Sequence, residues 1–233
     1  MNEAFKPFFE KYEALSASVE RAFETVKNQY PGCVKCKPLC SDCCYAVFDL
    51  TLIEAIYINA RFRAKYSGEP LEILTERCNR IDRALYKLKK SAYKAAESGK
   101  AETEILEEMA ETRVRCPMLS DAQMCEIYEF RPLTCKLYGI PTAIGGKGYT
   151  CGLSGFETGE KYPTASLDRI QNRLLELSAE LAAAIQSKYT RMGEMLVPLS
   201  MALVTDYDDA YLGIRKPGET AAAESQDEAG NTA

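Results

Sequence analysis

The cysteines are the residues whose type and spacing most clearly predict chemistry. Nine of the ten fall into two groups, and the chain contains no histidine. Thiolates are soft, charged donors, and sites built only from sulfur select zinc or iron–sulfur clusters among the common metals. Without histidine, every site that depends on imidazole ligands is excluded. The candidate metal ligands are therefore Cys33, Cys36, Cys40, Cys43 and Cys44 in the first group, and Cys116, Cys125, Cys135 and Cys151 in the second.

The spacing of the first group favours an iron–sulfur cluster over zinc. A zinc ribbon normally has two Cys-x2-Cys knuckles a dozen or more residues apart, so that two loops face each other across the ion. Here the pairs Cys33/Cys36 and Cys40/Cys43 are separated by only three residues. Such a run suits a wider object with ligands at different corners, as in ferredoxin-type runs, although it does not match a ferredoxin motif as written. We expect one or two iron–sulfur clusters of the 4Fe–4S type, with zinc or mononuclear iron as the alternative.

Composition and the first residues bear on compartment and partners. The chain has 233 residues, of which 46% are hydrophobic, and a net charge of −5. An acidic chain repels phosphate backbones, so nucleic acid is not an expected partner. The N-terminus lacks a basic segment followed by an apolar one, and no later apolar run approaches the roughly 20 residues that span a bilayer. We therefore expect a cytoplasmic protein without a membrane segment, whose cysteines serve metal or redox chemistry rather than disulfides.

The elements that must position the cysteines are mostly helices. Apolar residues recur three and four positions apart over residues 3–29, 70–97 and 165–188, which predicts helices there. Further helices are expected over 51–66, 102–113 and 190–204. Thr51 and Glu54 form a capping-box pattern at the start of the second helix. The third carries a coiled-coil-like seam, on which Cys78 is expected to act as a small hydrophobic residue. Pro198 interrupts the last.

The remaining segment, residues 116–163, has Pro- and Gly-rich turns without sustained periodicity, and a small hairpin is expected near 119–128. Gly145 to Gly148 lacks the phosphate-loop pattern and is interpreted as a turn. The fold class is therefore mainly α, a helical bundle with an irregular Cys-rich metal-binding lobe. We expect a single domain over residues 1–215, with Cys-rich segments 33–44 and 116–152. A disordered tail is expected over 216–233.

Helix lengths indicate that the two cysteine groups meet. At 1.5 Å per residue, the helix after Cys44 carries the chain about 27 Å away, the long helix returns it about 43 Å, and the next brings it back about 18–20 Å. If the three pack nearly antiparallel, the net displacement is small. We therefore expect Cys44 and Cys116 within about 20 Å of each other, at one metal-bearing end of the molecule.

At these residues the sequence resembles the CxxCxxCC family of bacterial and archaeal zinc- or iron-chelating cysteine-cluster proteins. The matching text is Cys40-Ser-Asp-Cys43-Cys44, Cys116-Pro-Met-Leu119, Cys125-Glu-Ile-Tyr128-Glu-Phe-Arg131-Pro132-Leu-Thr-Cys135 and Cys151-Gly152. The resemblance covers about residues 36–152. It implies an eight-cysteine ligand set, which maps onto Cys36, Cys40, Cys43, Cys44, Cys116, Cys125, Cys135 and Cys151.

The chain departs from that family at the start of the motif. Three residues rather than two separate Cys36 from Cys40, and Cys33 is extra. Whether Cys33 or Cys36 is the first ligand therefore stays open. The family also includes flagellin lysine N-methylases, which implies a protein-modifying role by analogy alone. The sequence has no glycine-rich strand–turn–helix pattern that would bind a methyl donor.

Two residues beside the cysteines are candidates for contact with the cofactor. Arg131 could donate hydrogen bonds to cluster sulfurs or offset the charge of several thiolates, or it could form a structural turn paired with an acidic neighbour. Tyr128, like Tyr138, could donate a proton, or it could be a buried tyrosine with a satisfied hydroxyl.

These features predict an iron–sulfur protein that acts in redox chemistry or electron transfer with a protein or redox partner. The alternatives are a binding module whose loops are stabilised by zinc or iron, and an enzyme that modifies proteins.

Overall fold

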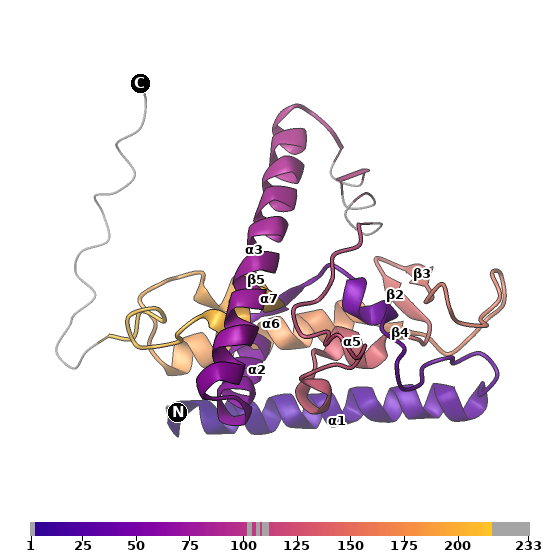
Figure 1. Cartoon of the computed structure of the whole chain (residues 1–233), viewed down its shortest axis with the longest axis horizontal. Helices are drawn as coiled ribbons and strands as arrows, with labels where there is room; N and C mark the ends of the chain where they lie inside the picture. Colours follow the sequence, from indigo (N-terminus) through magenta and orange to yellow (C-terminus); the bar gives the residue numbers. More distant parts are fainter. Residues whose placement is uncertain (1–2, 102–103, 106–107, 109–111, 216–233) are drawn as a thin grey trace.

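The computed structural model describes residues 3–101, 104–105, 108 and 112–215 (Figure 1). The described part is mostly helical, which confirms the predicted class. A short 3-10 helix, Glu3–Phe5, precedes α1. The α-helices are α1 (Lys6–Gln29), α2 (Leu52–Lys65), α3 (Gly68–Glu97), α5 (Leu133–Leu137), α6 (Leu167–Ala184) and α7 (Leu199–Val204). Three further 3-10 helices are η2 (Asp42–Tyr45), η3 (Tyr128–Phe130) and η4 (Met192–Glu194).

Two small sheets complete the fold. In the first, β1 (Asp49–Thr51) pairs antiparallel with β5 (Leu196–Pro198), with Leu50 opposite Val197. The second has the strand order β3-β2-β4. Its β2 (Thr142–Ile144) pairs antiparallel with β3 (Lys147–Tyr149) and parallel with β4 (Ala165–Ser166). The sheets therefore join segments that lie far apart in the chain.

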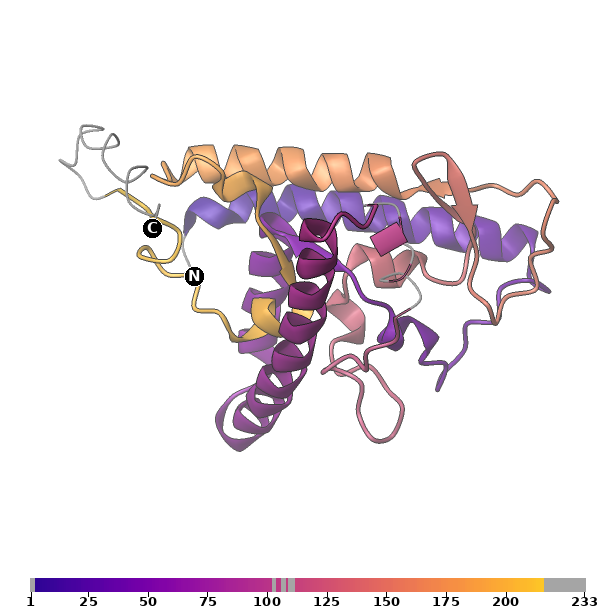
Figure 2. The same cartoon turned by 90° about the horizontal axis from the view of Figure 1, so that it is seen from above.

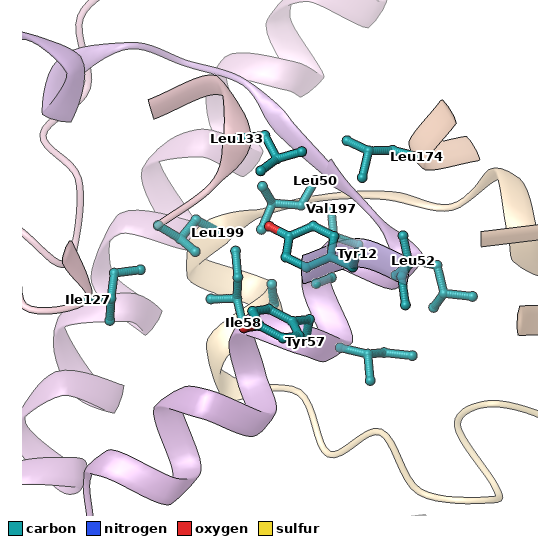
Figure 3. Close-up of a cluster of buried hydrophobic side chains, with 14 of the residues drawn as sticks. Tyr12, Leu50, Leu52, Tyr57, Ile58, Ile127, Leu133, Leu174, Val197 and Leu199 are labelled. Carbon is teal, nitrogen blue, oxygen red and sulfur yellow. The ribbon is translucent and has the colours of Figure 1, made fainter. Parts of the chain in front are cut away.

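The helices form a body from which α3 projects. Helices α1 and α6 pack side by side along the long axis (Figure 2), and α2 packs against α1, α6 and α7. In Figure 3, Tyr12 of α1 lies among Leu50, Leu52 and Val197, at the centre of the buried core. Residues 52–59 of α2 are all buried, because neighbouring elements surround this helix.

The predicted seam of α3 is buried along only part of its length. Leu74, Cys78 and Leu85 are buried, and the helix packs on α7. Tyr86 and Tyr93 on another face are exposed. Cys78 is fully buried, and burial raises the pKa of its thiol to about 12, as expected for a small hydrophobic residue in the core.

The capping box predicted at α2 is wrong in its contacts, although the helix begins where expected. Thr51 makes no side-chain cap hydrogen bond. Glu54 instead points into the core, where its carboxylate accepts hydrogen bonds from the hydroxyl of Tyr12 and the backbone N–H of Leu133. A tertiary use of Glu54 therefore replaces the local one.

The helical stretch predicted over residues 190–204, with an interruption at Pro198, is only partly helical: η4 covers Met192–Glu194, and α7 begins directly after Pro198. Residues 196–198 form β5, because the edge of β1 offers backbone partners that a local pattern does not reveal. The expected hairpin near 119–128 is reduced to one antiparallel bridge between Leu119 and Cys125. A longer hairpin, β2–β3, turns at Gly145 and Gly146, which both have positive φ. This confirms the turn predicted there.

Two predictions fall wholly or mainly on residues outside the described part. Within the helix expected over 102–113, the structure describes residues 104, 105 and 108, which are helical, and residues 112 and 113, which are not. The tail over 216–233 lies outside it entirely. Among the described residues, no helix combines the length and apolarity needed to cross a bilayer.

Candidate metal centre

The two cysteine groups meet at their ends. The backbone N–H of Cys116 donates to the carbonyl of Cys44 over 2.6 Å, and that of Val114 donates to the carbonyl of Tyr45 over 3.1 Å. The second group therefore begins alongside the end of the first, as the helix lengths predicted. The third helix used in that estimate lies mainly outside the described residues.

A cavity of about 700 Å³ opens where the groups meet. Its lining includes eight thiol-bearing residues, namely Cys36, Cys40, Cys43, Cys44, Cys116, Cys125, Cys135 and Cys151. All are free cysteines. In the described part of the chain, no three cysteine, acidic or histidine side chains converge closely enough to hold a single ion. The thiols therefore line a space far wider than one tetrahedral zinc ion occupies.

Cys33 does not line this cavity. Its carbonyl accepts the backbone N–H of Gly155 over 2.8 Å, and a Cβ at position 155 would lie 3.2 Å from the Cα of Cys33. Cys33 is half-buried against the core. The structure thus brings together eight of the nine predicted ligands and leaves Cys33 as a contact of the loop after Cys151.

The segment that carries Cys116 and Cys125 is folded by its own backbone. The N–H of Glu126 donates to the carbonyl of Met118, beside the bridge between Leu119 and Cys125. The thiol of Cys116 accepts the N–H of Met118 over 3.4 Å. Arg115 donates to the carbonyl of Leu119, which closes the turn. Both thiols are thus presented from one compact loop.

Helix α5, which carries Cys135, is anchored by two buried ionisable residues. Glu54 accepts the N–H of Leu133 over 2.8 Å at the start of the helix. Lys136 is buried, and its ammonium group donates to Ser16 over 2.8 Å and to Glu20 over 2.5 Å, both on α1. Because these contacts are made at Leu133 and Lys136, on either side of Cys135 in α5, they fix its position at the cavity wall.

Arg131 is the cationic residue whose charge acts on several of the cavity thiols. Its guanidinium lies 4.1 Å from the ring centroid of Tyr128. In the described residues, no carboxylate lies within ion-pair distance of Arg131, so the paired-turn interpretation is not favoured. Burial raises the pKa of Cys125 and Cys135, and the charge of Arg131 opposes this rise without reversing it. At Cys43 a hydrogen bond with Cys44 lowers the pKa, and the charge of Arg131 adds to this effect. Tyr128 is 58% exposed and is therefore not a buried tyrosine.

Cys43 and Cys44 differ in acidity although they are adjacent. A hydrogen bond with the thiol of Cys44 is the largest influence on Cys43 and, with the charge of Arg131, outweighs burial to lower its pKa to about 7. The same hydrogen bond and burial raise the pKa of Cys44. Cys43 is therefore the thiol most ready to ionise near neutral pH.

Asp42 links several parts of the site. Its carboxylate accepts the hydroxyl of Tyr138 over 2.8 Å, the thiol of Cys151 over 3.4 Å and the guanidinium of Arg113 over 2.5 Å. Burial opposes ionisation, but the hydrogen bonds from Tyr138 and Arg113 outweigh it, and the pKa of Asp42 is lowered. The sequence signal for Asp42 was its place inside Cys40-Ser-Asp-Cys43.

The absence of a side chain at Gly139 lets the backbone there lie directly against the sulfur of Cys36. The thiol of Cys36 donates to the carbonyl of Tyr138 over 3.5 Å. A Cβ at position 139 would lie 2.3 Å from that sulfur, and Gly139 has a φ of 109°, which favours glycine. Its position between Tyr138 and Ile140 carried no sequence signal for this role.

Comparison with known proteins agrees with this geometry. Residues 35–152 match the model of the CxxCxxCC family, described as a "Putative zinc- or iron-chelating domain". The matched range begins after Cys33 and contains all eight cysteines of the cavity. No curated protein and no solved structure matches the chain.

Proposed function

Since the chain belongs to the CxxCxxCC family of zinc- or iron-chelating cysteine-rich domains, we propose that its cavity thiols hold iron–sulfur chemistry for redox reactions or electron transfer. The observation that carries this proposal is the gathering of eight free thiols around one cavity in a chain without histidine. All-thiolate ligation is the usual donor set of iron–sulfur clusters.

The width of the site supports a cluster over a single ion. One tetrahedral zinc needs four donors about 2.3 Å from a common centre, whereas these thiols are spread around about 700 Å³. A cluster distributes its ligands among several metal atoms. The donor chemistry also fits, since Arg131 offers positive charge to a set of thiolates that would otherwise repel one another.

Each neighbouring residue has a physical task at such a centre. A bound cluster would accept and release single electrons. Arg131 stabilises thiolates, Asp42 and Tyr138 orient Cys151 and Cys36, and Glu54 fixes the helix that carries Cys135. Such neighbours tune metal centres by orienting ligands and by hydrogen bonding.

The mouth of the cavity suits a protein redox partner. Leu39, Met124 and Tyr128 line the cavity and are 65%, 48% and 58% exposed. Exposed apolar and aromatic side chains around a functional opening are typical of protein contact sites. A partner that docks there would approach the thiols closely enough to exchange electrons.

A second candidate function is a binding module whose loops are fixed by zinc or iron. It is favoured by the scant regular structure of the lobe, where η3 and α5 have three and five residues. Metal ligation can supply the folding free energy that such loops lack.

Anaerobic purification followed by metal and sulfide analysis tests the proposal. We expect brown protein that contains iron and acid-labile sulfide, with a paramagnetic resonance signal that changes on reduction by dithionite. Cys78→Ala, outside the cavity, is the matched control and should keep the colour, whereas Cys116→Ala should weaken it. Colourless protein that contains zinc alone would overturn the redox function and favour the binding module.

A further inference from the structure

We propose that the eight thiols form two separate centres of four thiols each. The inner centre comprises Cys44, Cys116, Cys125 and Cys135, and the outer centre comprises Cys36, Cys40, Cys43 and Cys151. This inference rests on the proposed metal-binding function and assigns its ligands. Four thiolates are the full ligand set of one 4Fe–4S cluster or one structural zinc ion, so the cavity holds two complete sets.

The inner set is tied together by backbone contacts. The 2.6 Å hydrogen bond from Cys116 to Cys44 places these residues side by side, and the bridge between Leu119 and Cys125 folds the same loop. Cys135 faces them from α5. Burial raises the pKa of Cys135, and the thiols of Cys43, Cys116 and Cys125, which line the same cavity, raise it further.

The outer set is tied together by Asp42 and Tyr138. Asp42 lies between Cys40 and Cys43 in the chain and accepts the thiol of Cys151. The hydroxyl of Tyr138 donates to the same carboxylate, and its carbonyl accepts the thiol of Cys36. Two residues therefore connect all three segments that supply the outer thiols.

The electrostatics of the outer thiols agree with these contacts. Burial raises the pKa of Cys36 to about 11, and its thiol neighbours are Cys40, Cys151 and Cys43 rather than the inner set. Burial also raises the pKa of Cys151, with Cys40 as its thiol neighbour.

The adjacent pair Cys43-Cys44 divides between the centres because of η2. A 3-10 helix has three residues per turn, so successive side chains point about 120° apart. Cys43 and Cys44 are consecutive in η2, and Cys44 is buried while Cys43 is half-buried. Cys43 lies at the boundary. Its thiol hydrogen-bonds with that of Cys44, and it is an electrostatic neighbour of the inner Cys116, Cys125 and Cys135 as well as of the outer Cys36. We assign Cys44 to the inner centre, where it lies beside Cys116, and Cys43 to the outer centre, where it completes a set of four with Cys36, Cys40 and Cys151.

The two centres differ in their access to solvent. The outer set contains Cys36, the one exposed cysteine among the described residues, whereas the inner set contains the buried Cys44. The outer metal is therefore the one that meets chelators and oxidants first, and the inner metal is the more protected.

Metal counting on matched variants tests the division. Cys36→Ala and Cys151→Ala remove outer thiols, Cys116→Ala and Cys125→Ala remove inner ones, and Cys33→Ala and Cys78→Ala are controls outside the cavity. Each full-length protein is purified anaerobically, its helicity is verified by circular dichroism, and its iron, sulfide and zinc per chain are measured. We expect the controls to match the wild type and each cavity variant to lose about half the metal, as for one of two four-thiolate sets.

A double variant, Cys36→Ala with Cys116→Ala, should lose nearly all of it. A single outer variant that loses all metal would overturn the division, and so would a wild type that contains only the metal of one four-thiolate centre per chain. If inner variants fail to fold, native mass spectrometry of the wild type under increasing chelator replaces them. Two successive losses are expected, and a single concerted loss contradicts the inference.

The failure of the redox proposal and the failure of this division give different readouts. Protein that contains zinc instead of iron would end the iron–sulfur assignment, yet about two zinc ions in the wild type and about one in each cavity variant would still support two centres. Iron and sulfide in the amount of one cluster would support the iron–sulfur assignment and overturn the division into two centres.

Discussion

The carboxylate of Glu54 accepts the backbone N–H of Leu133 over 2.8 Å, across 79 residues of sequence. A side chain on the central helix α2 thereby accepts the first backbone N–H of α5, two residues before Cys135. The same carboxylate accepts the hydroxyl of Tyr12. The core and the thiol-lined cavity are thus joined through one buried carboxyl group.

Replacement of Glu54 tests this junction. Glu54→Ala leaves the buried donors of Leu133 and Tyr12 without partners, and we expect it to lower the free energy of unfolding by about 2–4 kcal/mol. Glu54→Gln keeps an acceptor oxygen of the same reach and should retain most of that free energy and the metal content. Denaturant titration measures both. Equal losses in the two variants would show that the oxygen is not what matters.

The pH dependence of stability should also change at Glu54. Burial raises its pKa in the folded protein above the usual 4.5, against the opposing hydrogen bonds from Leu133 and Tyr12. The folded state therefore holds this proton more tightly than the unfolded state. The stabilisation is fully present below pH 4.5 and is lost as the pH rises through the higher folded value. In Glu54→Gln this loss should be absent, as denaturant titrations over a pH series would measure.

Gly139→Ala should displace Cys36. The new methyl group would lie 2.3 Å from the sulfur, and the φ of 109° strains any side chain there. We expect a destabilisation of about 1–3 kcal/mol and a loss of outer metal, measured as metal per chain. Gly148→Ala is the control, because its Cβ would meet nothing within 4 Å. Full metal content in Gly139→Ala would contradict the role assigned to the close approach.

Arg131→Gln should make Cys43 less acidic. The charge of Arg131 is one of the effects that lower the pKa of Cys43 to about 7, after the hydrogen bond from Cys44 and against burial. Since the thiolate is the reactive form, alkylation of reduced, metal-free protein by iodoacetamide at pH 7 should slow at Cys43, with peptide mass mapping as the readout. Arg191→Gln, whose guanidinium pairs with Glu194, is the control. Unchanged alkylation in Arg131→Gln would exclude an electrostatic role.

Removal of metal should loosen the lobe and leave the core intact. The buried residues of the cluster around Tyr12, Leu50 and Leu52 include no cavity thiol, and Cys116 and Cys125 pack against that cluster only as partly buried residues. Hydrogen exchange of chelator-treated protein should therefore show lost protection over residues 116–126 and 138–155, with α1, α2 and α6 unchanged. Loss of protection throughout the chain would mean that the metal holds the whole fold.

The long helices followed from local patterning, whereas the short elements did not. Apolar spacing located α1, α3 and α6, because each buries one stripe over several turns. The capping-box pattern located α2, whose residues 52–59 are all buried. β5 could not be predicted in this way, since its strand geometry depends on β1, far away in the chain. The five residues of α5 are too few for a periodic signal.

The ligands of the site were evident from residue type, and their supports were not. Cysteine spacing identified the donors without deciding between Cys33 and Cys36. Asp42 contacts Cys151, which is 109 positions away, and Glu54 contacts Leu133, which is 79 positions away. Gly139 acts through its close approach to Cys36. Such pairings exist only once tertiary structure is formed.

The wide separation of the two cysteine groups in the chain has a consequence for when the metal can bind during synthesis. Synthesis proceeds from the N-terminus at about 5–20 residues per second, so Cys36 to Cys44 leave the ribosome seconds before their partners exist. During that interval they meet the cell's metals and oxidants as an incomplete set. With the assignment above, the inner donors are complete only when Cys135 emerges and the outer donors only at Cys151. Correct metal loading is therefore a late event, and the inner position is the first that can be filled.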